Sequence, residues 1–176
     1  MRIILIFTIL LQFSCLKQRD FTTYVIKKGT DCQNHIPELV GNKLSYTIMF
    51  DSSAIYVIDS VEQYDLNKLF GFSACNTHHH ENSARFAWRW LNGNLEIHGY
   101  IYENGKRDFF FLQNVQINQW NHYYLENTGS NYIFVLNGQN YDRVRMNTCL
   151  SATNYELFPC FGGNTLSPHD ITIYFK

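Results

Sequence analysis

Three Asn-Gly dipeptides, each between runs in which apolar and polar residues alternate, constrain the fold of this chain more than any other feature. They are Asn92-Gly93, Asn104-Gly105 and Asn137-Gly138. A two-residue hairpin turn needs positive φ at both central residues, and Asn and Gly tolerate this best. Alternation with period two places apolar side chains on one face of a strand. These patterns together predict antiparallel hairpins rather than helices.

The rest of the chain continues this pattern, with a short helix expected only near residues 61–68. Aromatic residues (16%) are as common as charged ones (16%), which is typical of a sheet-rich domain. We expect an all-β antiparallel β-sandwich or barrel. The ten expected strands are Thr23–Lys27, Leu44–Phe50, Ala54–Ile58, Lys68–Ser73, Ala84–Leu91, Leu95–Glu103, Asp108–Ile117, Asn121–Glu126, Tyr132–Leu136 and Asp170–Phe175.

The charge of the chain excludes two classes of protein. Its 176 residues include 14 Lys and Arg against 15 Asp and Glu, for a net charge of -1. A protein that binds nucleic acid by neutralising phosphates is usually basic, so we expect no nucleic-acid partner. A disordered chain combines few aromatic residues with a high net charge, and this chain has neither.

The N-terminus has the pattern of an export signal. Arg2 precedes an almost uninterrupted apolar run over residues 3–13, which is shorter than the ~20 residues that span a bilayer. Ser14-Cys15 then resembles the lipobox of bacterial lipoproteins. We expect a signal peptide at residues 1–14, a lipidated Cys15 with a tether to residue 22, and one domain over residues 23–176. This predicts a membrane-anchored envelope lipoprotein, periplasmic or at the outer membrane; the alternative is ordinary cleavage and a secreted protein.

Four further cysteines are available for disulfides in an exported chain. They are Cys32, Cys75, Cys149 and Cys160, which allow three pairings. We expect Cys149 to pair with Cys160, as a local link across a loop, and Cys32 to pair with Cys75 by elimination. The alternative is that some of the four are free buried thiols.

The register of one hairpin follows from its turn. If Asn92-Gly93 is the turn, Trp90 faces Leu95 and Trp88 faces Ile97 on an apolar face, while Arg89 faces Glu96 on the other. A slip by one residue would turn both tryptophans outward. The polar face then carries Arg85, Arg89, Glu96, His98, Tyr100 and Tyr102.

Two segments resemble a known group of proteins. One is Asn82-Ser83-Ala84-Arg85-Phe86-Ala87-Trp88-Arg89-Trp90 with the following Gly99-Tyr100-Ile101-Tyr102-Glu103-Asn104-Gly105, and the other is Phe161-Gly162-Gly163 followed by Pro168-His169-Asp170-Ile171. They resemble small exported proteins and lipoproteins of Bacteroidetes-type genomes over roughly residues 67–176. The resemblance implies a concanavalin-A-like jelly roll, as in lectins and glucanases, and carries no established chemistry. Cys160 departs from the group, which has an aromatic residue there, and this favours a local disulfide.

The run His78-His79-His80-Glu81 offers metal-ligating side chains. Adjacent residues of one loop rarely form a closed tetrahedral site, and no spaced pair such as H-E-x-x-H occurs. We therefore expect no metal centre and no cofactor, with these four residues as weak candidates for adventitious binding.

The polar face of the hairpin is the candidate binding site. Tyrosines can stack on sugar rings, and the fork of an arginine fits a carboxylate, so we expect this face to bind a glycan or another envelope component. An enzyme is the alternative. Some jelly-roll polysaccharide lyases combine Arg, His and Tyr, and here Arg85 would hold a uronate while Tyr100 and His98 move protons. Their usual Gln-Ile-His motif and the glucanase E-x-D-x-x-E signature are not found, which favours binding over catalysis. A third alternative is a structural accessory protein without a small ligand.

Overall fold

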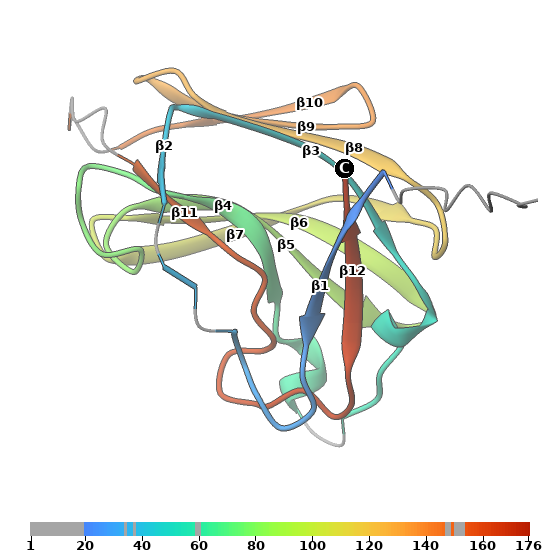
Figure 1. Cartoon of the computed structure of the whole chain (residues 1–176). Helices are drawn as coiled ribbons and strands as arrows, with labels where there is room; N and C mark the ends of the chain where they lie inside the picture. Colours follow the sequence, from blue (N-terminus) through green and yellow to red (C-terminus); the bar gives the residue numbers. More distant parts are fainter. Residues whose placement is uncertain (1–19, 34, 37, 59–60, 147–148, 150–153) are drawn as a thin grey trace, which may run out of the picture.

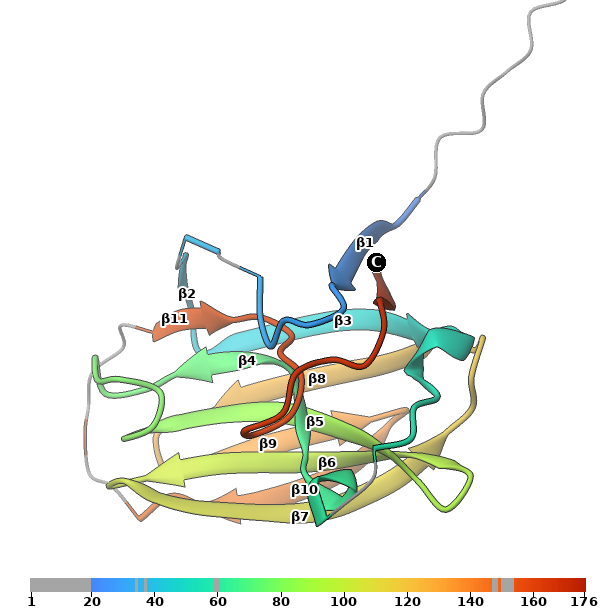
Figure 2. The same ribbon diagram turned by 90° about the horizontal axis from the view of Figure 1, so that it is seen from below.

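The structure, a computed structural model, describes residues 20–33, 35–36, 38–58, 61–146, 149 and 154–176. Within these ranges two six-stranded antiparallel sheets pack face to face (Figures 1 and 2). The first sheet has the order β1 (Thr22–Ile26), β12 (Ile171–Phe175), β3 (Lys43–Phe50), β8 (Asn121–Asn127), β9 (Asn131–Leu136) and β10 (Gln139–Val144). The second has the order β2 (Leu39–Val40), β11 (Asn154–Leu157), β4 (Asn67–Ser73), β5 (Ser83–Leu91), β6 (Asn94–Glu103) and β7 (Lys106–Val115). The predicted all-β antiparallel sandwich is confirmed.

The three Asn-Gly dipeptides form the hairpin turns that the sequence predicts. They join β5 to β6, β6 to β7 and β9 to β10. The asparagines have φ of 50°, 51° and 51°, and the glycines that follow have φ of 77°, 77° and 84°. Positive φ at both central residues matches the right-handed twist of the flanking strands.

The register of the β5–β6 hairpin also agrees with the prediction. Trp88 pairs with Ile97 and Phe86 with Gly99, so their side chains point into the space between the sheets. Phe86 is fully buried there, with its ring edge-on to those of Tyr123 on β8 and Phe134 on β9, at centroid distances of 5.1 and 5.2 Å. Contacts of this kind between the facing sheets form the core.

One local prediction is wrong, and another is confirmed only in part. Residues 54–58 do not form a strand. Instead, a short 3-10 helix, η1 (Ser52–Ala54), is capped by Asp51, whose carboxylate accepts a hydrogen bond from the Ser53 N–H at 2.8 Å. The helix expected near residues 61–68 is limited to the 3-10 helix η2 (Val61–Tyr64), because β4 begins at Asn67. Strands β2, β10 and β11 were not expected.

The predicted disulfide pairing is also wrong. The structure links Cys32 to Cys160 and Cys75 to Cys149. Strand β11 lies between Cys149 and Cys160 and pairs antiparallel with β4. One end of β11 therefore lies beside Cys75, which follows β4, and the other beside Lys68, whose N–H donates to the Cys160 carbonyl oxygen at 2.8 Å. An extended strand rises ~3.3 Å per residue, so it holds Cys149 and Cys160 apart.

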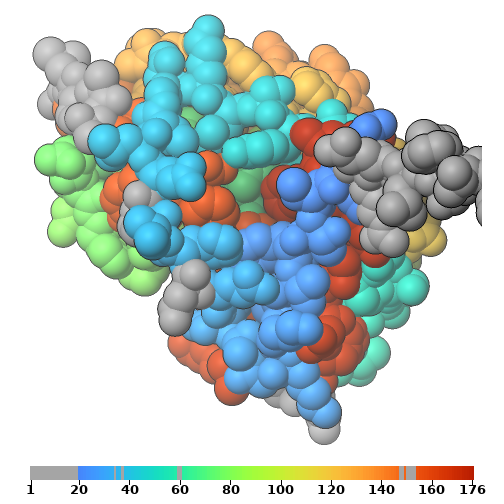
Figure 3. Space-filling model, viewed as in Figure 1, coloured from blue at the N-terminus to red at the C-terminus, as the bar shows by residue number. Residues whose placement is uncertain are grey.

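The N-terminal segment is attached to the sandwich at its edge. Strand β1 pairs with β12, and Figure 3 shows the blue and cyan segment lying beside the red C-terminal part of the chain. The predicted signal peptide, Cys15 and most of the tether lie outside the described residues. Within the described part, no helix is long and apolar enough to cross a membrane.

Candidate functional site

The polar face predicted for the β5–β6 hairpin is the outer face of the second sheet. Cross-strand pairing places Arg85 on β5 beside Tyr100 on β6, and Tyr100 beside Phe109 on β7. In the next row Tyr102 pairs with Arg107. Because side chains alternate along each strand, these residues all project away from the core.

Two adjoining cavities of about 500 and 420 Å³ lie over this face, and we call them together the cleft. Both are lined by Lys68, His80 and Gly163. The first cavity also contains Tyr100, Tyr102, Arg107 and Phe109, and the second contains Arg85, His79 and Tyr155. Figure 2 shows the connection between β11 and β12 lying over β4 and β5. Residues of this connection, among them Phe161 and Gly163, line the cleft.

Arg85 is a buried cation that has no carboxylate partner among the described residues. It is only 6% exposed, its Nε makes no hydrogen bond to any described residue, and each ion pair found among the described residues involves other side chains. Burial lowers the pKa of Arg85 to about 10, so the guanidinium stays charged at neutral pH. An uncompensated buried charge is costly, and a planar carboxylate from a ligand would compensate it.

A glycine on the neighbouring strand makes room for this arginine. Gly71 on β4 pairs with Arg85, and a Cβ at Gly71 would lie 2.4 Å from the Arg85 Cβ and 2.1 Å from the Ala84 carbonyl oxygen. Real side chains do not approach this closely. Gly71 therefore lets β4 pass beside Arg85, where β4 also shifts its register against β5.

Lys68 is the second cation at the base of the cleft. Its Nζ donates hydrogen bonds to the carbonyl oxygens of Leu66 and Gly162, both at 2.8 Å. Burial and, after it, the positive charge of Arg85 lower the pKa of Lys68 to about 8, while Asp65 acts in the opposite direction. Lys68 is thus partly compensated by Asp65, whereas Arg85 is not.

Three further charged side chains line the cleft. Arg107 lines the first cavity and is exposed. Asp31 and Glu156 line the second cavity, and the Glu156 carboxylate accepts a hydrogen bond from the Tyr46 hydroxyl. Among the described residues, neither of these carboxylates forms an ion pair with Arg85.

Tyr100 and Tyr102 provide hydroxyl groups in the first cavity. Burial, followed by the hydrogen bond with Tyr102, raises the pKa of Tyr100 to about 12, although Arg107 opposes this. The phenol of Tyr100 is therefore protonated at neutral pH and can donate a hydrogen bond. The Lys68 ammonium lies 5.1 Å from the centroid of the Tyr100 ring. The site combines cations and phenols, as the recognition of acidic sugars requires.

The other three predicted residues form a separate network on the same face. Arg89 Nε lies 2.7 Å from Glu96 Oε2, and His98 Nε2 lies 3.0 Å from the same oxygen. His98 is buried, with its ring 5.6 Å from that of Phe111. None of the three lines the cleft. The structure thus separates Arg85, Tyr100 and Tyr102 from Arg89, Glu96 and His98.

The histidine run lies in the loop between β4 and β5, at the edge of the cleft. His79 lines the second cavity and His80 lines both. The ligand nitrogens of His78, His79 and His80 form one group, to which Glu81 does not belong.

Sequence reasoning missed several residues of the cleft. Arg107 and Phe109 could have been found, because the turn at Asn104-Gly105 places them opposite Tyr102 and Tyr100 in the same way as the first hairpin. Lys68 and Tyr155 come from strands whose pairing depends on residues far away in the sequence. No local pattern indicates their position.

Comparisons with family models and with curated proteins give no match. Solved structures do share the fold. The alginate lyase vAL-1 from Chlorella virus has a TM-score of 0.56 at 14% identity, over 89% of this chain and 82% of that chain. The alginate lyase AlyC3 in complex with dimannuronate has a TM-score of 0.60 at 10% identity, over 88% of this chain and 71% of that chain.

A glycoside hydrolase family 16 endo-glucanase from Bacteroides ovatus is similar as well. Its TM-score is 0.56 at 13% identity, over 78% of this chain and 68% of that chain. At such identities the likeness shows the fold alone, which is the expected concanavalin-A-like jelly roll. Membership of the exported Bacteroidetes-type group stays a prediction.

Proposed function

We propose that this chain binds an acidic polysaccharide in the cleft, with a uronate carboxylate against Arg85. The observation that carries the proposal is the buried guanidinium, which has no carboxylate partner among the described residues. A carboxylate that accepts two parallel N–H bonds would neutralise the charge and satisfy its donors. The Tyr100 and Tyr102 hydroxyls would then bond to sugar hydroxyls.

The size and the composition of the cleft support a polymer rather than a small metabolite. Its two cavities adjoin along the sheet, which gives room for more than one sugar unit. The exposed ring of Phe109 offers a surface for stacking on a sugar. Several proteins of this fold are named as alginate lyases, and one was solved with dimannuronate. This makes mannuronate oligomers the first ligands to test.

Export to the cell envelope is part of the same proposal. Disulfides persist in oxidising compartments, and the pairs Cys32–Cys160 and Cys75–Cys149 agree with such a location. The signal peptide would direct export, and lipid attachment at Cys15 would then hold the domain at a membrane. Metabolic labelling with a fatty acid should mark the wild-type chain and not Cys15→Ala. An unlabelled wild-type chain would instead favour a secreted protein.

The binding proposal is tested by calorimetric titration with a matched pair of ligands. One is a mannuronate oligomer, and the other is the same oligomer with its carboxyl groups reduced to alcohols. The charged oligomer should bind at least about tenfold more tightly, since a charged hydrogen bond contributes about 1.5–3 kcal/mol. Equal binding of both would refute the role of the carboxylate, and binding of neither would favour a structural accessory protein.

Arg85→Gln and Arg143→Gln form a matched pair of variants for this titration. Arg143 lies on β10 in the other sheet, above the ring of Phe110. Arg85→Gln should lose the preference for the charged oligomer, and Arg143→Gln should keep it. Loss in both variants would show that the affinity depends on overall charge rather than on the cleft.

A lyase is the second candidate, and the position of Tyr100 favours it. Tyr100 is the cross-strand partner of Arg85 and lines the cleft, so it lies near any uronate held there. In β-elimination a base removes the C5 proton, a C4–C5 double bond forms, the glycosidic C4–O bond breaks, and an acid protonates the leaving oxygen. The raised pKa of Tyr100 suits the acid. His98 does not fit a role, because it is bonded to Glu96 outside the cleft.

The lyase candidate has a direct assay. Each cleavage creates an unsaturated uronate that absorbs ultraviolet light, so the absorbance of a polymannuronate solution should rise with the enzyme and not with Tyr100→Phe. A wild-type chain that binds the polymer without any rise in absorbance is a binding protein.

A further inference from the structure

The histidines at the edge of the cleft are grouped as metal ligands are. One ring nitrogen from each of His78, His79 and His80 lies within 4.8 Å of the other two. Around a tetrahedral Zn²⁺, with Zn–N bonds of about 2.0–2.1 Å, neighbouring nitrogens are about 3.4 Å apart. His78 and His80 are exposed, so rotation of their side chains can close this difference.

The grouping follows from a turn in the backbone. In a strand, three consecutive side chains alternate between opposite faces. Here the N–H groups of Glu81 and Asn82 donate to the His78 carbonyl oxygen at 2.8 and 3.3 Å, which turns the chain back on itself. The rings of His78 and His79 are 4.1 Å apart between centroids, and those of His79 and His80 are 4.4 Å apart.

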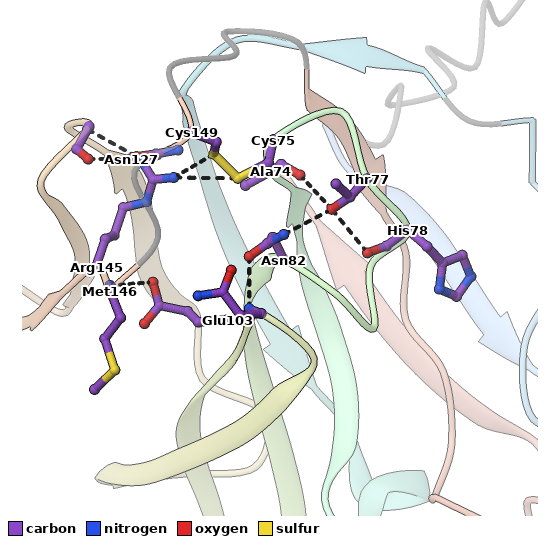
Figure 4. The surroundings of a disulfide bond; sticks show 12 residues. Ala74, Cys75, Thr77, His78, Asn82, Glu103, Asn127, Arg145, Met146 and Cys149 are labelled. Carbon is purple, nitrogen blue, oxygen red and sulfur yellow. Dashed lines mark hydrogen bonds between the residues drawn. A yellow bond between two sulfur atoms is a disulfide. The ribbon is translucent and has the colours of Figure 1, made fainter.

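The loop that carries the histidines is fixed at its base. Figure 4 shows the disulfide from Cys75 to Cys149 and the hydrogen bonds beside it. The Thr77 hydroxyl donates to the Ala74 carbonyl oxygen at 3.1 Å, and the Asn82 side-chain amide donates to the Thr77 hydroxyl at 3.2 Å. A ligand set held in this way loses less conformational entropy when it binds an ion.

Hydrogen bonds also hold the central histidine and its ring. The N–H of His79 donates to the Tyr155 hydroxyl at 3.0 Å, and His79 Nδ1 lies 3.4 Å from the same hydroxyl. The Ser83 hydroxyl donates to the His79 carbonyl oxygen at 2.7 Å. The N–H of His80 donates to His78 Nδ1 at 3.3 Å. A metal-binding imidazole typically donates its second ring N–H to a polar partner, as His79 Nδ1 can do to the Tyr155 hydroxyl.

We propose that His78, His79 and His80 form a site for a divalent transition-metal ion of the Zn²⁺ and Cu²⁺ class. Imidazole nitrogen suits these ions, and three protein ligands leave a fourth position open for water or for an oxygen of another molecule.

The ion would stand at the entrance of the cleft. His80 lines both cavities, and its ring lies 5.3 Å from that of Tyr102. The open position of the ion could therefore accept a carboxylate or hydroxyl oxygen of a ligand in the cleft. The glycan should then bind more strongly in the presence of the ion. This consequence rests on the proposed function, whereas the metal site itself does not.

Metal binding is tested on the folded full chain without any glycan, by titrating Zn²⁺ against a chromophoric chelator. We expect one equivalent to bind, with a loss of at least about tenfold in affinity for His79→Gln. His122→Gln is the matched control, since His122 is exposed on β8 in the other sheet, and it should bind as the wild type does.

A synthetic peptide of residues 76–82 carries the same three histidines without the folded loop, so comparing its affinity with that of the chain shows whether the fold forms the site. The folded chain should bind Zn²⁺ at least about tenfold more tightly than this peptide, because the turn and the disulfide order the ligands beforehand. Equal affinities would mean an adventitious ion only and would overturn the proposal, as would unchanged binding by His79→Gln. A titration with the mannuronate oligomer, with and without Zn²⁺, then tests the glycan consequence separately.

Discussion

Replacing Arg85 by methionine should stabilise the fold and remove glycan binding. Methionine retains most of the length of the side chain and removes its charge. Burial lowers the pKa of Arg85 to about 10 in the folded chain, which destabilises the charged form by an amount on the order of 3 kcal/mol. Because the folded-state pKa is the lower one, this penalty is fully present below pH 10 and disappears above the unfolded value.

Part of this penalty should be recovered in the variant. Removal of a buried charge in favour of an apolar side chain typically recovers 1–4 kcal/mol, and the lost packing of the guanidinium offsets some of it. A net gain of about 2 kcal/mol raises the melting temperature of a domain of this size by about 4–8 °C. Affinity for the mannuronate oligomer should fall at least about tenfold.

Thermal unfolding and calorimetric titration of the same two variants test this reasoning. Arg89→Met is the control, because Arg89 lies on the same strand but is paired with Glu96 at 2.7 Å. Its loss leaves a largely buried carboxylate less compensated and should lower the melting temperature. If Arg85→Met lowers the melting temperature and leaves the affinity unchanged, Arg85 is a structural residue and the reasoning is refuted.

Three further predictions concern pH, packing and disulfides. Affinity for the oligomer should fall by up to about 30-fold between pH 7 and about 9.5, because Lys68, with a pKa of about 8, loses its charge. In a series of titrations at different pH values, Lys68→Met should show no such fall. Gly71→Ala should lower the free energy of unfolding, measured in urea, by at least about 2 kcal/mol, because the new Cβ would lie 2.1 Å from the Ala84 carbonyl oxygen. An unchanged free energy of unfolding would contradict the close approach of β4 and β5. Peptide mapping without reduction should recover Cys32 linked to Cys160, and a peptide linking Cys160 to Cys149 would disprove this pairing. Replacing both Cys32 and Cys160 by serine should cost about 3–5 kcal/mol of stability, since the bond closes a loop of 128 residues.

The hairpins were predictable because their information is local. Asn92-Gly93 fixes both the turn and the register, so the direction of every side chain on β5 and β6 follows from the alternation. By contrast, residues 54–58 are an apolar run typical of a strand, but the side chain of Asp51 caps a 3-10 helix that ends at Ala54. Sequence alone does not show which of the two competing local interactions prevails.

The site was only partly predictable, because it depends on pairing between distant strands. The face that carries Arg85 and Tyr100 followed from one hairpin, but burial of Arg85 requires β4 and the connection after β11. His98 shares that face and nevertheless lies outside the cleft, because Glu96 binds it. The prediction of the disulfide pairing failed for the same reason, because the antiparallel pairing of β11 with β4 decides which cysteines meet.

A crystal structure of the chain with a bound mannuronate oligomer tests the central claim most directly. The account predicts a uronate carboxylate over β5, with its oxygens about 2.7–2.9 Å from the guanidinium nitrogens of Arg85. An oligomer bound elsewhere on the surface, or one in the cleft whose carboxylates all point away from Arg85, would contradict it.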